Sequence, residues 1–390
     1  MKDILNQFKN IVSRFKDLTS LSIATLVTNG IGGIFWLYMA SLLGTEGYGE
    51  ISYLISIAII SSTLSLAGMT NVLIVYGAKN VKIQSTVFVI GSITSLTTSL
   101  IIFFFVAEDI TISLYVIGFV IFNLISSDMI GRKLFQKYSK IIIIQKIILV
   151  VLAIILYHII GLQGVILGIA ISFLLFSFIF YKRIKEMKID FSIFKDKYKF
   201  TINSYLLDIS GAFQGSLDKI IILPILGFSL LGNYQLGLQF ISLLYLIPGM
   251  LFSYVLSQDA SEIPTKIIKR IIISISIIFA ILSIILSPIF VPMIFPEFIE
   301  SVIVIQIMSV SIVPSAIAQS YVSKYLGMAK SKIVIVGAGL FLLVQIISII
   351  TLGNVYGLNG AAVSLIISSI VYASYFVIID RFYYKSRLVT

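Results

Sequence analysis

The 390-residue sequence contains no cysteine and only one histidine. Without cysteine, the chain has no disulfide, no thiolate metal site and no thiol nucleophile. A single histidine also argues against a dedicated zinc or haem site, because such sites draw on histidine or cysteine ligands. We therefore predict a protein with neither a metal centre nor a cofactor.

Charged residues are scarce as well. They make up 12% of the chain, about half of the share that is usual in soluble proteins, whereas apolar residues make up 59%. With a mean hydropathy of +1.10, too little polar surface remains to cover a water-soluble domain. Uncharged apolar runs recur along the whole chain, and many reach the roughly 20 residues that cross a hydrocarbon core. The runs lack the alternating polarity of barrel strands, so the sequence predicts an all-α integral membrane protein.

About twelve transmembrane helices are predicted from apolar runs that are bounded by charge clusters. Their expected positions are residues 20–43, 49–68, 85–106, 110–131, 141–160, 162–181, 204–227, 231–255, 271–293, 300–322, 333–351 and 357–379.

The distribution of lysine and arginine sets the direction of these helices. With a cytoplasmic amino terminus, 26 of the 28 Lys and Arg residues fall in the tails and inward-facing gaps, and the outward-facing gaps hold none. This positive-inside pattern predicts an even number of helices in the cell (plasma) membrane, with both termini cytoplasmic. It also explains the net charge of +11, because the basic residues face anionic lipid headgroups. No nucleic-acid partner is therefore expected.

An internal duplication is visible in three short motifs that recur in the same order, at offsets of 183, 192 and 196 residues. Each motif alone is weak, but together they indicate two halves of six helices. The motifs are Leu43-Gly44 with Gly47-Tyr48, repeated as Leu226-Gly227 with Gly232-Asn233-Tyr234; Ser139-Lys140-Ile141, repeated as Ser331-Lys332-Ile333; and Gly161-Leu162-Gln163-Gly164, repeated as Gly357-Leu358-Asn359-Gly360.

The duplication predicts an N-terminal six-helix bundle (1–181), a basic cytoplasmic linker (182–203) and a C-terminal six-helix bundle (204–390). Because six is even, the halves are parallel repeats around a central cleft, an architecture typical of transporters. A channel and a membrane enzyme are the alternatives. No outward gap has the length of a catalytic domain or carries clustered acids and histidines, so an enzyme is not expected. The linker is either a surface helix, with Phe191, Ile193-Phe194 and Tyr198 on the membrane, or a solvated segment.

Ionisable residues inside the predicted spans are candidates for function, because each costs about 3 kcal/mol to insert. Lys146 is expected one turn inside its helix, where its stem reaches the headgroups, and His158 is expected at the outer end. For both, we predict an interfacial role without function. Lys219 is different, because it lies eight residues before Gly227 and thus about 12 Å below the outer end of its helix.

The same face of this seventh helix carries Asp208, three turns before Lys219, together with Gly211 and Gly215. Charge and small residues on one face predict the wall of a water-filled cleft. The alternative is Gly-x-x-x-Gly helix packing, with the charges paired to neighbours. Asp218 is adjacent to Lys219 in sequence, and we do not expect these two side chains to face each other.

The first helix is glycine-rich and therefore bendable at Asn29, Gly30, Gly32 and Gly33. A shift of 183 residues places Trp36, the only tryptophan, at the position equivalent to Lys219. Trp36 either stacks on a sugar ring or contacts a cation in the cleft, or it is packed in the core.

The chain resembles the polysaccharide biosynthesis membrane proteins, the oligosaccharide-flippase family of the superfamily that also holds the multidrug/toxin extruders. Many members of the family are longer, and some have fourteen helices. The resemblance covers nearly the whole chain and is carried by four segments: Leu42-Leu43-Gly44-Thr45-Glu46-Gly47-Tyr48-Gly49, Asp218-Lys219-Ile220-Ile221, Ile294-Phe295-Pro296-Glu297-Phe298 and Gly327-Met328-Ala329-Lys330.

The resemblance implies that an oligosaccharide linked to polyprenyl or dolichyl diphosphate is moved to the outer leaflet. Lys219 is then the predicted phosphate contact, and Asp208, Asp218 and Asn29 bond sugar hydroxyls or hold Lys219 in place. Lys219→Ala is expected to lower transfer strongly, and Lys146→Ala is not. Membrane lipids, glycan-assembly enzymes and a coupling ion are the other partners considered. The alternatives are a multidrug/toxin-type exporter coupled to Na⁺ or H⁺ and a non-transporting scaffold.

Overall fold

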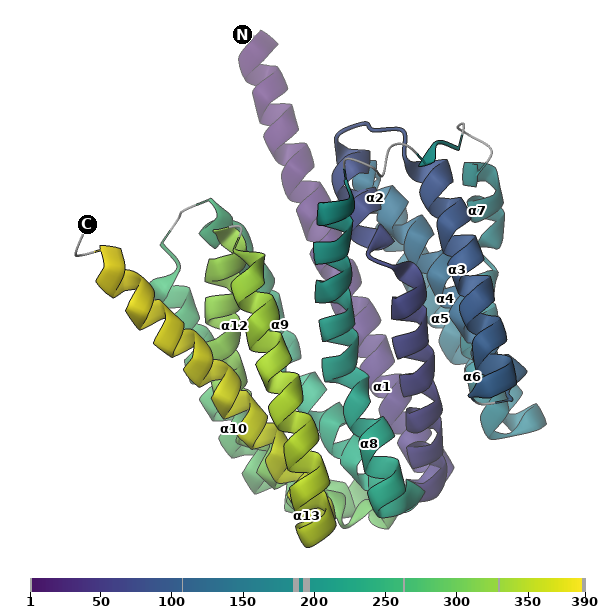
Figure 1. The fold of residues 1–390 in the computed structure, drawn as a ribbon, viewed down its shortest axis with the longest axis vertical. Helices are drawn as coiled ribbons and strands as arrows, with labels where there is room; N and C mark the ends of the chain where they lie inside the picture. The colour runs from purple at the N-terminus through teal and green to yellow at the C-terminus, as the bar shows by residue number, and fades with distance from the viewer. Residues whose placement is uncertain are drawn as a thin grey trace. The chain divides into compact units, whose positions relative to one another are not determined.

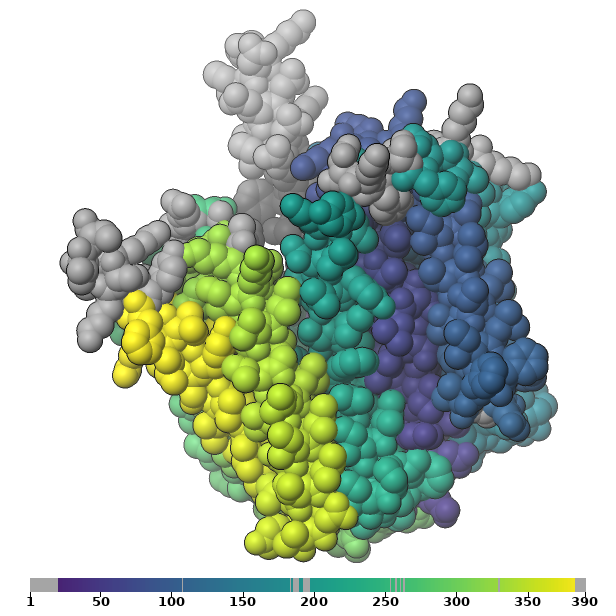
Figure 2. Space-filling view, viewed as in Figure 1, coloured from purple at the N-terminus to yellow at the C-terminus, as the bar shows by residue number. Residues whose placement is uncertain are grey.

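A computed structural model of the chain describes residues 2–106, 108–184, 189–191, 197–261, 264–328 and 330–387. These residues are almost entirely α-helical, and they contain no strand (Figure 1). The chain is therefore an all-α integral membrane protein, as predicted from its apolar runs. Large apolar side chains are exposed along the long helices, including the surface of α13 (Ser331–Arg387; yellow in Figure 2), as contact with lipid requires.

The first of two compact units comprises Met1–Phe35 and Ala58–Ile209. It holds both ends of α1 (Lys2–Leu66) and the start of α8 (Tyr198–Leu244). In its core, α4 packs against α2, α3 and α6, and α6 also packs along α5. The remaining helices are α2 (Met69–Ala78), α3 (Gln84–Phe105), α4 (Ile110–Gly131), α5 (Phe135–Ile160), α6 (Leu162–Leu174) and α7 (Ser177–Ile184).

The second unit comprises Trp36–Ile57 and Ser210–Thr390. It contains the middle of α1 and most of α8, and α12 lies at its centre in contact with α9, α10 and α13. Its other elements are α9 (Leu246–Ala260), α10 (Lys266–Ile294), the 3₁₀ turn η2 (Pro296–Phe298), α11 (Ser301–Ser309), α12 (Ile312–Gly327) and α13.

Twelve membrane-crossing segments follow from the helices described. Eight helices are long and apolar enough to cross a membrane, and the bent pair α11–α12 makes a ninth. Three of the eight contain one glycine with non-helical dihedral angles and so form two segments each, which brings the total to twelve. These glycines are Gly44 in α1, Gly227 in α8 and Gly357 in α13. Gly44 lies in a predicted gap, and Gly227 and Gly357 are the predicted helix ends that border two others.

The same glycines support the predicted duplication. Gly44 and Gly227 belong to one repeated motif and adopt φ values of 66° and 81°, a region that glycine enters without strain. Gly161 and Gly357 belong to another motif and adopt φ values of 70° and 59°. The two halves therefore break their helices at equivalent positions, by the same change in the backbone.

A close helix crossing in the second unit relates the halves directly. A Cβ atom added to Gly49 would lie 1.9 Å from the carbonyl oxygen of Phe228, and one added to Gly232 would lie 1.9 Å from that of Thr45. Thr45 and Gly49 precede Phe228 and Gly232 by the same 183 residues. These two segments of the second unit therefore contact each other through equivalent atoms, which is the pattern of a local two-fold axis.

The compact units do not follow the predicted domain limits throughout. Residues 36–57 group with the second unit and residues 204–209 with the first. The bundles 1–181 and 204–390, with a cleft between them, stay a prediction. Ile193-Phe194 of the predicted linker lie outside the described residues, whereas Phe191 and Tyr198 are described and exposed.

Candidate functional site

A polar cavity of about 410 Å³ lies within the second unit. Helices α8, α12 and α13 supply most of its wall, and Lys219 and Asp218 are part of it. Most of the other polar groups are uncharged amides and hydroxyls, which both donate and accept hydrogen bonds. They come from Gln214, Gln235, Gln239, Gln319, Gln345, Ser242, Ser311, Ser315 and Tyr245.

Lys219 lines this cavity but is already paired. Its Nζ donates to the carbonyl oxygen of Gly215 at 2.6 Å and lies 3.1 Å from Asp218 Oδ1. Asp218 Oδ2 also accepts a hydrogen bond of 3.1 Å from the Tyr234 hydroxyl. The expectation that Asp218 and Lys219 would not face each other is wrong, because the flexible lysine stem folds back along α8. The pair contributes almost no net charge to the cavity.

The glycines beside this pair face open space. A Cβ atom added to Gly211 or Gly215 would meet no described atom within 4 Å, and Gly215 lines the cavity. The structure therefore does not show the Gly-x-x-x-Gly helix packing that was the alternative for these two positions. The other part of that alternative was that the charges pair with neighbouring side chains, and the Lys219–Asp218 pair agrees with it.

Two buried atoms on the cavity wall have unused hydrogen-bonding capacity. Gln345 is 3% exposed, and its Nε2 has no hydrogen-bond partner in the described part of the chain. The buried Gln235 Oε1 has none there either. An unsatisfied buried polar atom costs about 1–3 kcal/mol, so such atoms mark a place where a polar ligand or water gains binding energy.

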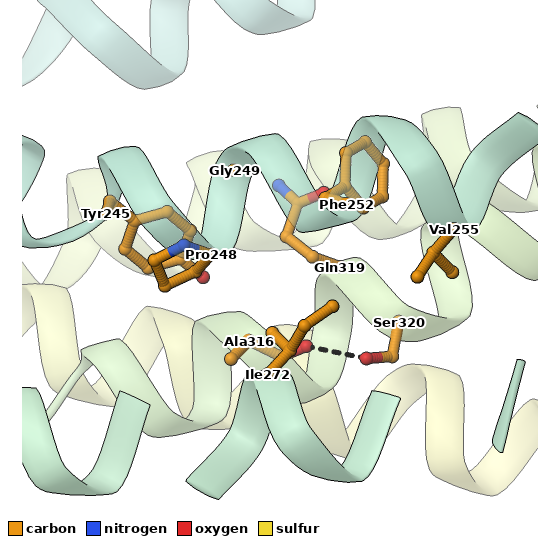
Figure 3. A pocket seen from close by; sticks show the side chains of 9 residues that line it. All are labelled: Tyr245, Pro248, Gly249, Phe252, Val255, Ile272, Ala316, Gln319 and Ser320. Atoms are coloured by element: carbon orange, nitrogen blue, oxygen red, sulfur yellow. Dashed lines mark hydrogen bonds between the residues drawn. The ribbon is translucent and has the colours of Figure 1, made fainter. Parts of the chain in front are cut away.

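A smaller pocket of about 160 Å³ adjoins this wall and shares Tyr245 and Gln319 with it (Figure 3). Apart from these two residues and Ser320, its lining is glycine and apolar side chains of α9, α10 and α12. Ser320 Oγ donates to the Ala316 carbonyl oxygen at 3.0 Å, so this hydroxyl is held on its own helix. The polar cavity therefore has an apolar annex on the α9 side.

Asp208 does not line this cavity. It belongs to the first unit, where Asn71 Nδ2 donates to Oδ1 at 3.1 Å and Thr70 Oγ1 donates to Oδ2 at 3.3 Å. The start of α8 approaches α2 because Gly68 has no side chain: a Cβ atom there would lie 2.7 Å from the Thr201 carbonyl oxygen. The structure does not join Asp208 to Lys219, although both lie on α8.

The glycine-rich stretch of α1 is regular helix, and the break lies at Gly44 instead. Asn29 is exposed, and Gly30 faces open space, whereas Gly33 is buried. The hinge predicted at residues 30–33 is thus not bent in this structure, because a glycine permits a kink without imposing one.

Trp36 is half-buried against Tyr48, with ring centroids 6.4 Å apart. Tyr48 is fully buried and packs in turn against Phe298 at 6.0 Å. This aromatic contact agrees with the core-packing alternative for Trp36, and a role in binding stays a prediction.

Lys146 lies farther from the start of its helix than the sequence predicts. Helix α5 begins at Phe135, so Lys146 is three turns from its start rather than one. The apolar run predicted a helix start at residue 141, which is too late because the polar residues 136–140 are already helical. His158 is exposed in the last turn of α5 beside Tyr157, as expected.

Comparison with solved structures identifies the fold. A lipid II flippase, MurJ, in an inward closed conformation matches with a TM-score of 0.75 at 16% identity, over 93% of this chain and 87% of its own. An inward-facing multidrug resistance MATE transporter of the MOP superfamily matches with a TM-score of 0.71 at 14% identity, over 96% and 99%. This chain has the MOP transporter fold.

The MATE transporter AtDTX14 gives a TM-score of 0.59 at 18% identity, over 95% of this chain and 96% of its own. A scan of protein-family models and a search of curated proteins both find no match. The similarity in structure at these identities establishes the fold, and the resemblance noted from the sequence agrees with it.

Proposed function

We propose that this protein moves an oligosaccharide, linked to polyprenyl or dolichyl diphosphate, from the cytoplasmic to the outer leaflet of the plasma membrane. The halves would alternate between inward and outward access, with both termini in the cytoplasm. The MOP transporter fold and the similarity to a lipid II flippase support a transporter of a lipid-linked molecule rather than an enzyme.

The composition of the polar cavity is the observation that carries this proposal. Five glutamines and three serines offer donors and acceptors to the hydroxyl groups of a sugar, and Gln345 Nε2 has no partner among the described residues. The Lys219–Asp218 pair adds no net charge, but a lysine has three donors and Lys219 uses two. Its third hydrogen can reach a sugar or phosphate oxygen. The annex beside Tyr245 would take an apolar part of the substrate.

The membrane potential supplies a driving force for this direction of transfer. An inside-negative potential favours outward movement of an anion by about 2.3 kcal/mol per charge per 100 mV. A diphosphate can therefore be driven outward without a coupling ion.

The second candidate is export of an amphipathic small molecule coupled to Na⁺ or H⁺, because MATE transporters have the same fold. A cationic drug needs an uncompensated acid, and the acid described in the cavity, Asp218, is paired with Lys219. The lining thus favours a neutral, hydroxyl-rich group over a cation.

The deciding experiment uses purified protein in proteoliposomes. A lipid-linked oligosaccharide is placed in the inner leaflet, and its appearance outside is measured with a membrane-impermeant glycosidase. Efflux of a fluorescent amphipathic cation, with and without a Na⁺ or H⁺ gradient, is measured in parallel. The proposal expects oligosaccharide transfer above that of protein-free vesicles. Gradient-driven cation efflux without oligosaccharide transfer would establish the second candidate instead.

A further inference from the structure

The position of Lys146 along α5 is fixed by two contacts with α1 in the first unit. The hydroxyls of Ser20 and Ser139 lie 3.1 Å apart, which places these two residues at one level of the helix pair. Further along both helices, Lys146 Cε lies 2.9 Å from the position that a Cβ atom on Gly32 would occupy. The two contacts occur in the same order along both helices, so α1 and α5 run parallel.

The lysine side chain points away from the nearer membrane surface. From Ser139 to Lys146, α5 rises about 10 Å, whereas α1 rises about 18 Å from Ser20 to Gly32. The side chain therefore extends along the helix pair away from the level of Ser139, toward Gly32. A snorkelling lysine would extend in the opposite direction, toward the headgroups beyond Ser139. The interfacial role predicted for Lys146 does not fit this geometry.

No group in the described part of the chain neutralises this amine. Lys146 has neither a hydrogen bond nor an ion pair there. Two acids of the first unit are engaged elsewhere: Asp128 with Arg132 at 2.8 Å and Asp208 with Asn71 at 3.1 Å. Lys219, by contrast, is paired with Asp218. An unpaired cation at this depth is costly, which makes Lys146 a candidate for ligand binding.

The neighbouring turn of α1 supplies further hydrogen-bond donors near Lys146. Asn29 is exposed and precedes Gly32 by three residues, so it lies one turn away on the face of α1 that meets Lys146. Its amide nitrogen offers two hydrogen-bond donors, and the lysine offers three. Gly32 contributes no side chain to this face of α1. This arrangement of donors beside an uncompensated positive charge suits an anion.

We infer that Lys146, together with Asn29, binds a phosphate group of the transported molecule. A compact ammonium charge is a suitable partner for phosphate oxygens, and binding would supply the counter-charge that Lys146 lacks. The inference rests on the proposed function for the source of that phosphate, the diphosphate of a lipid-linked oligosaccharide. It moves the predicted phosphate contact from Lys219 to Lys146.

Binding measurements on the full-length protein in detergent test this assignment with three ligands: the lipid-linked oligosaccharide diphosphate, an uncharged glycolipid with the same glycan, and inorganic pyrophosphate. Lys146→Met is expected to weaken binding of the diphosphate lipid about 10- to 100-fold, the loss typical of a hydrogen bond to a charged group. Binding of the uncharged glycolipid should not change. Lys146→Arg should restore most of the affinity for the diphosphate lipid, because it restores the positive charge.

The matched control is Lys140→Met, which removes an exposed lysine six residues earlier on α5 and should leave every affinity unchanged. Thermal unfolding of each variant verifies that the fold is retained. Binding of pyrophosphate tests the anion site independently of the proposed transport function. If pyrophosphate binding depends on Lys146 but no lipid-linked oligosaccharide is transferred, the anion site stands and the proposed function fails. If wild type and Lys146→Met bind the diphosphate lipid equally, the inference is overturned, whatever the transfer assay shows.

Discussion

The Lys219 amine lies 3.1 Å from the Asp218 carboxylate, although these residues are neighbours in sequence. Both are nearly buried, at 6% and 3% exposure, and Tyr234 and the Gly215 carbonyl complete the network. One deep lysine is thus neutralised on the wall of the polar cavity, whereas the other, Lys146, is not. The two lysines therefore differ in whether a counter-charge accompanies them in the described part of the chain.

The Lys219–Asp218 pair should be sensitive to the loss of one partner. Asp218→Asn leaves a buried lysine without its counter-charge and is expected to destabilise the protein by about 3–5 kcal/mol. The double variant Asp218→Asn/Lys219→Met removes both charges and should regain most of that stability. Thermal unfolding in detergent measures both. Equal instability of the single and double variants would mean that packing, rather than charge pairing, matters here.

The helix crossing at Gly49 and Gly232 should not tolerate a side chain. Gly232→Ala places a methyl group about where the Thr45 carbonyl lies, and a Cβ at 1.9 Å from that oxygen cannot be accommodated without moving backbone. We expect a severe loss of folded protein in the membrane. Gly211→Ala is the matched control in the same helix, and the open space around it predicts a neutral effect or a gain of up to about 1 kcal/mol. Comparable yields of the two variants would refute the crossing.

The hydrogen bonds of Asp259 make the stability of the protein depend on pH. Burial alone would raise the pKa of this carboxyl, but hydrogen bonds from Lys269, Ser323 and Thr265 outweigh it and hold the pKa below the ordinary value of 3.8. The stabilisation is therefore present above pH 3.8 and is lost as the pH falls through the lower folded-state value. Asp259→Asn should lower the unfolding temperature at neutral pH and have little effect well below that value. An effect independent of pH would show that the charge is not responsible.

Much of the fold could be predicted from the sequence, because apolar length and basic flanks are direct consequences of the membrane. The segment breaks at Gly44, Gly227 and Gly357 lie in predicted gaps or at their borders, since positive φ favours glycine where a helix reverses. The start of α5 was misplaced because six polar or aromatic residues extend the helix before its apolar run. That error placed Lys146 about two turns too close to the start of its helix.

The candidate site was only partly predictable. The cavity glutamines come from helices that are far apart in sequence, such as Gln214 on α8 and Gln345 on α13, so no local motif joins them. Their signal was available, however, as amides that interrupt apolar runs. The Lys219–Asp218 pair was missed because helix geometry describes Cβ directions, whereas a four-carbon stem can bend back to a neighbour.

The most direct measurement of the central claim is oligosaccharide transfer by Gln345→Leu in proteoliposomes. This change removes a cavity amide with little change in volume, and Gln306→Leu is its control, because Gln306 bonds the Ile284 carbonyl and does not line the cavity described here. We expect Gln345→Leu to lower transfer about 10-fold, the effect of one lost polar contact of roughly 1.4 kcal/mol, and Gln306→Leu to transfer like wild type. Transfer at the wild-type rate by a folded Gln345→Leu protein would contradict it.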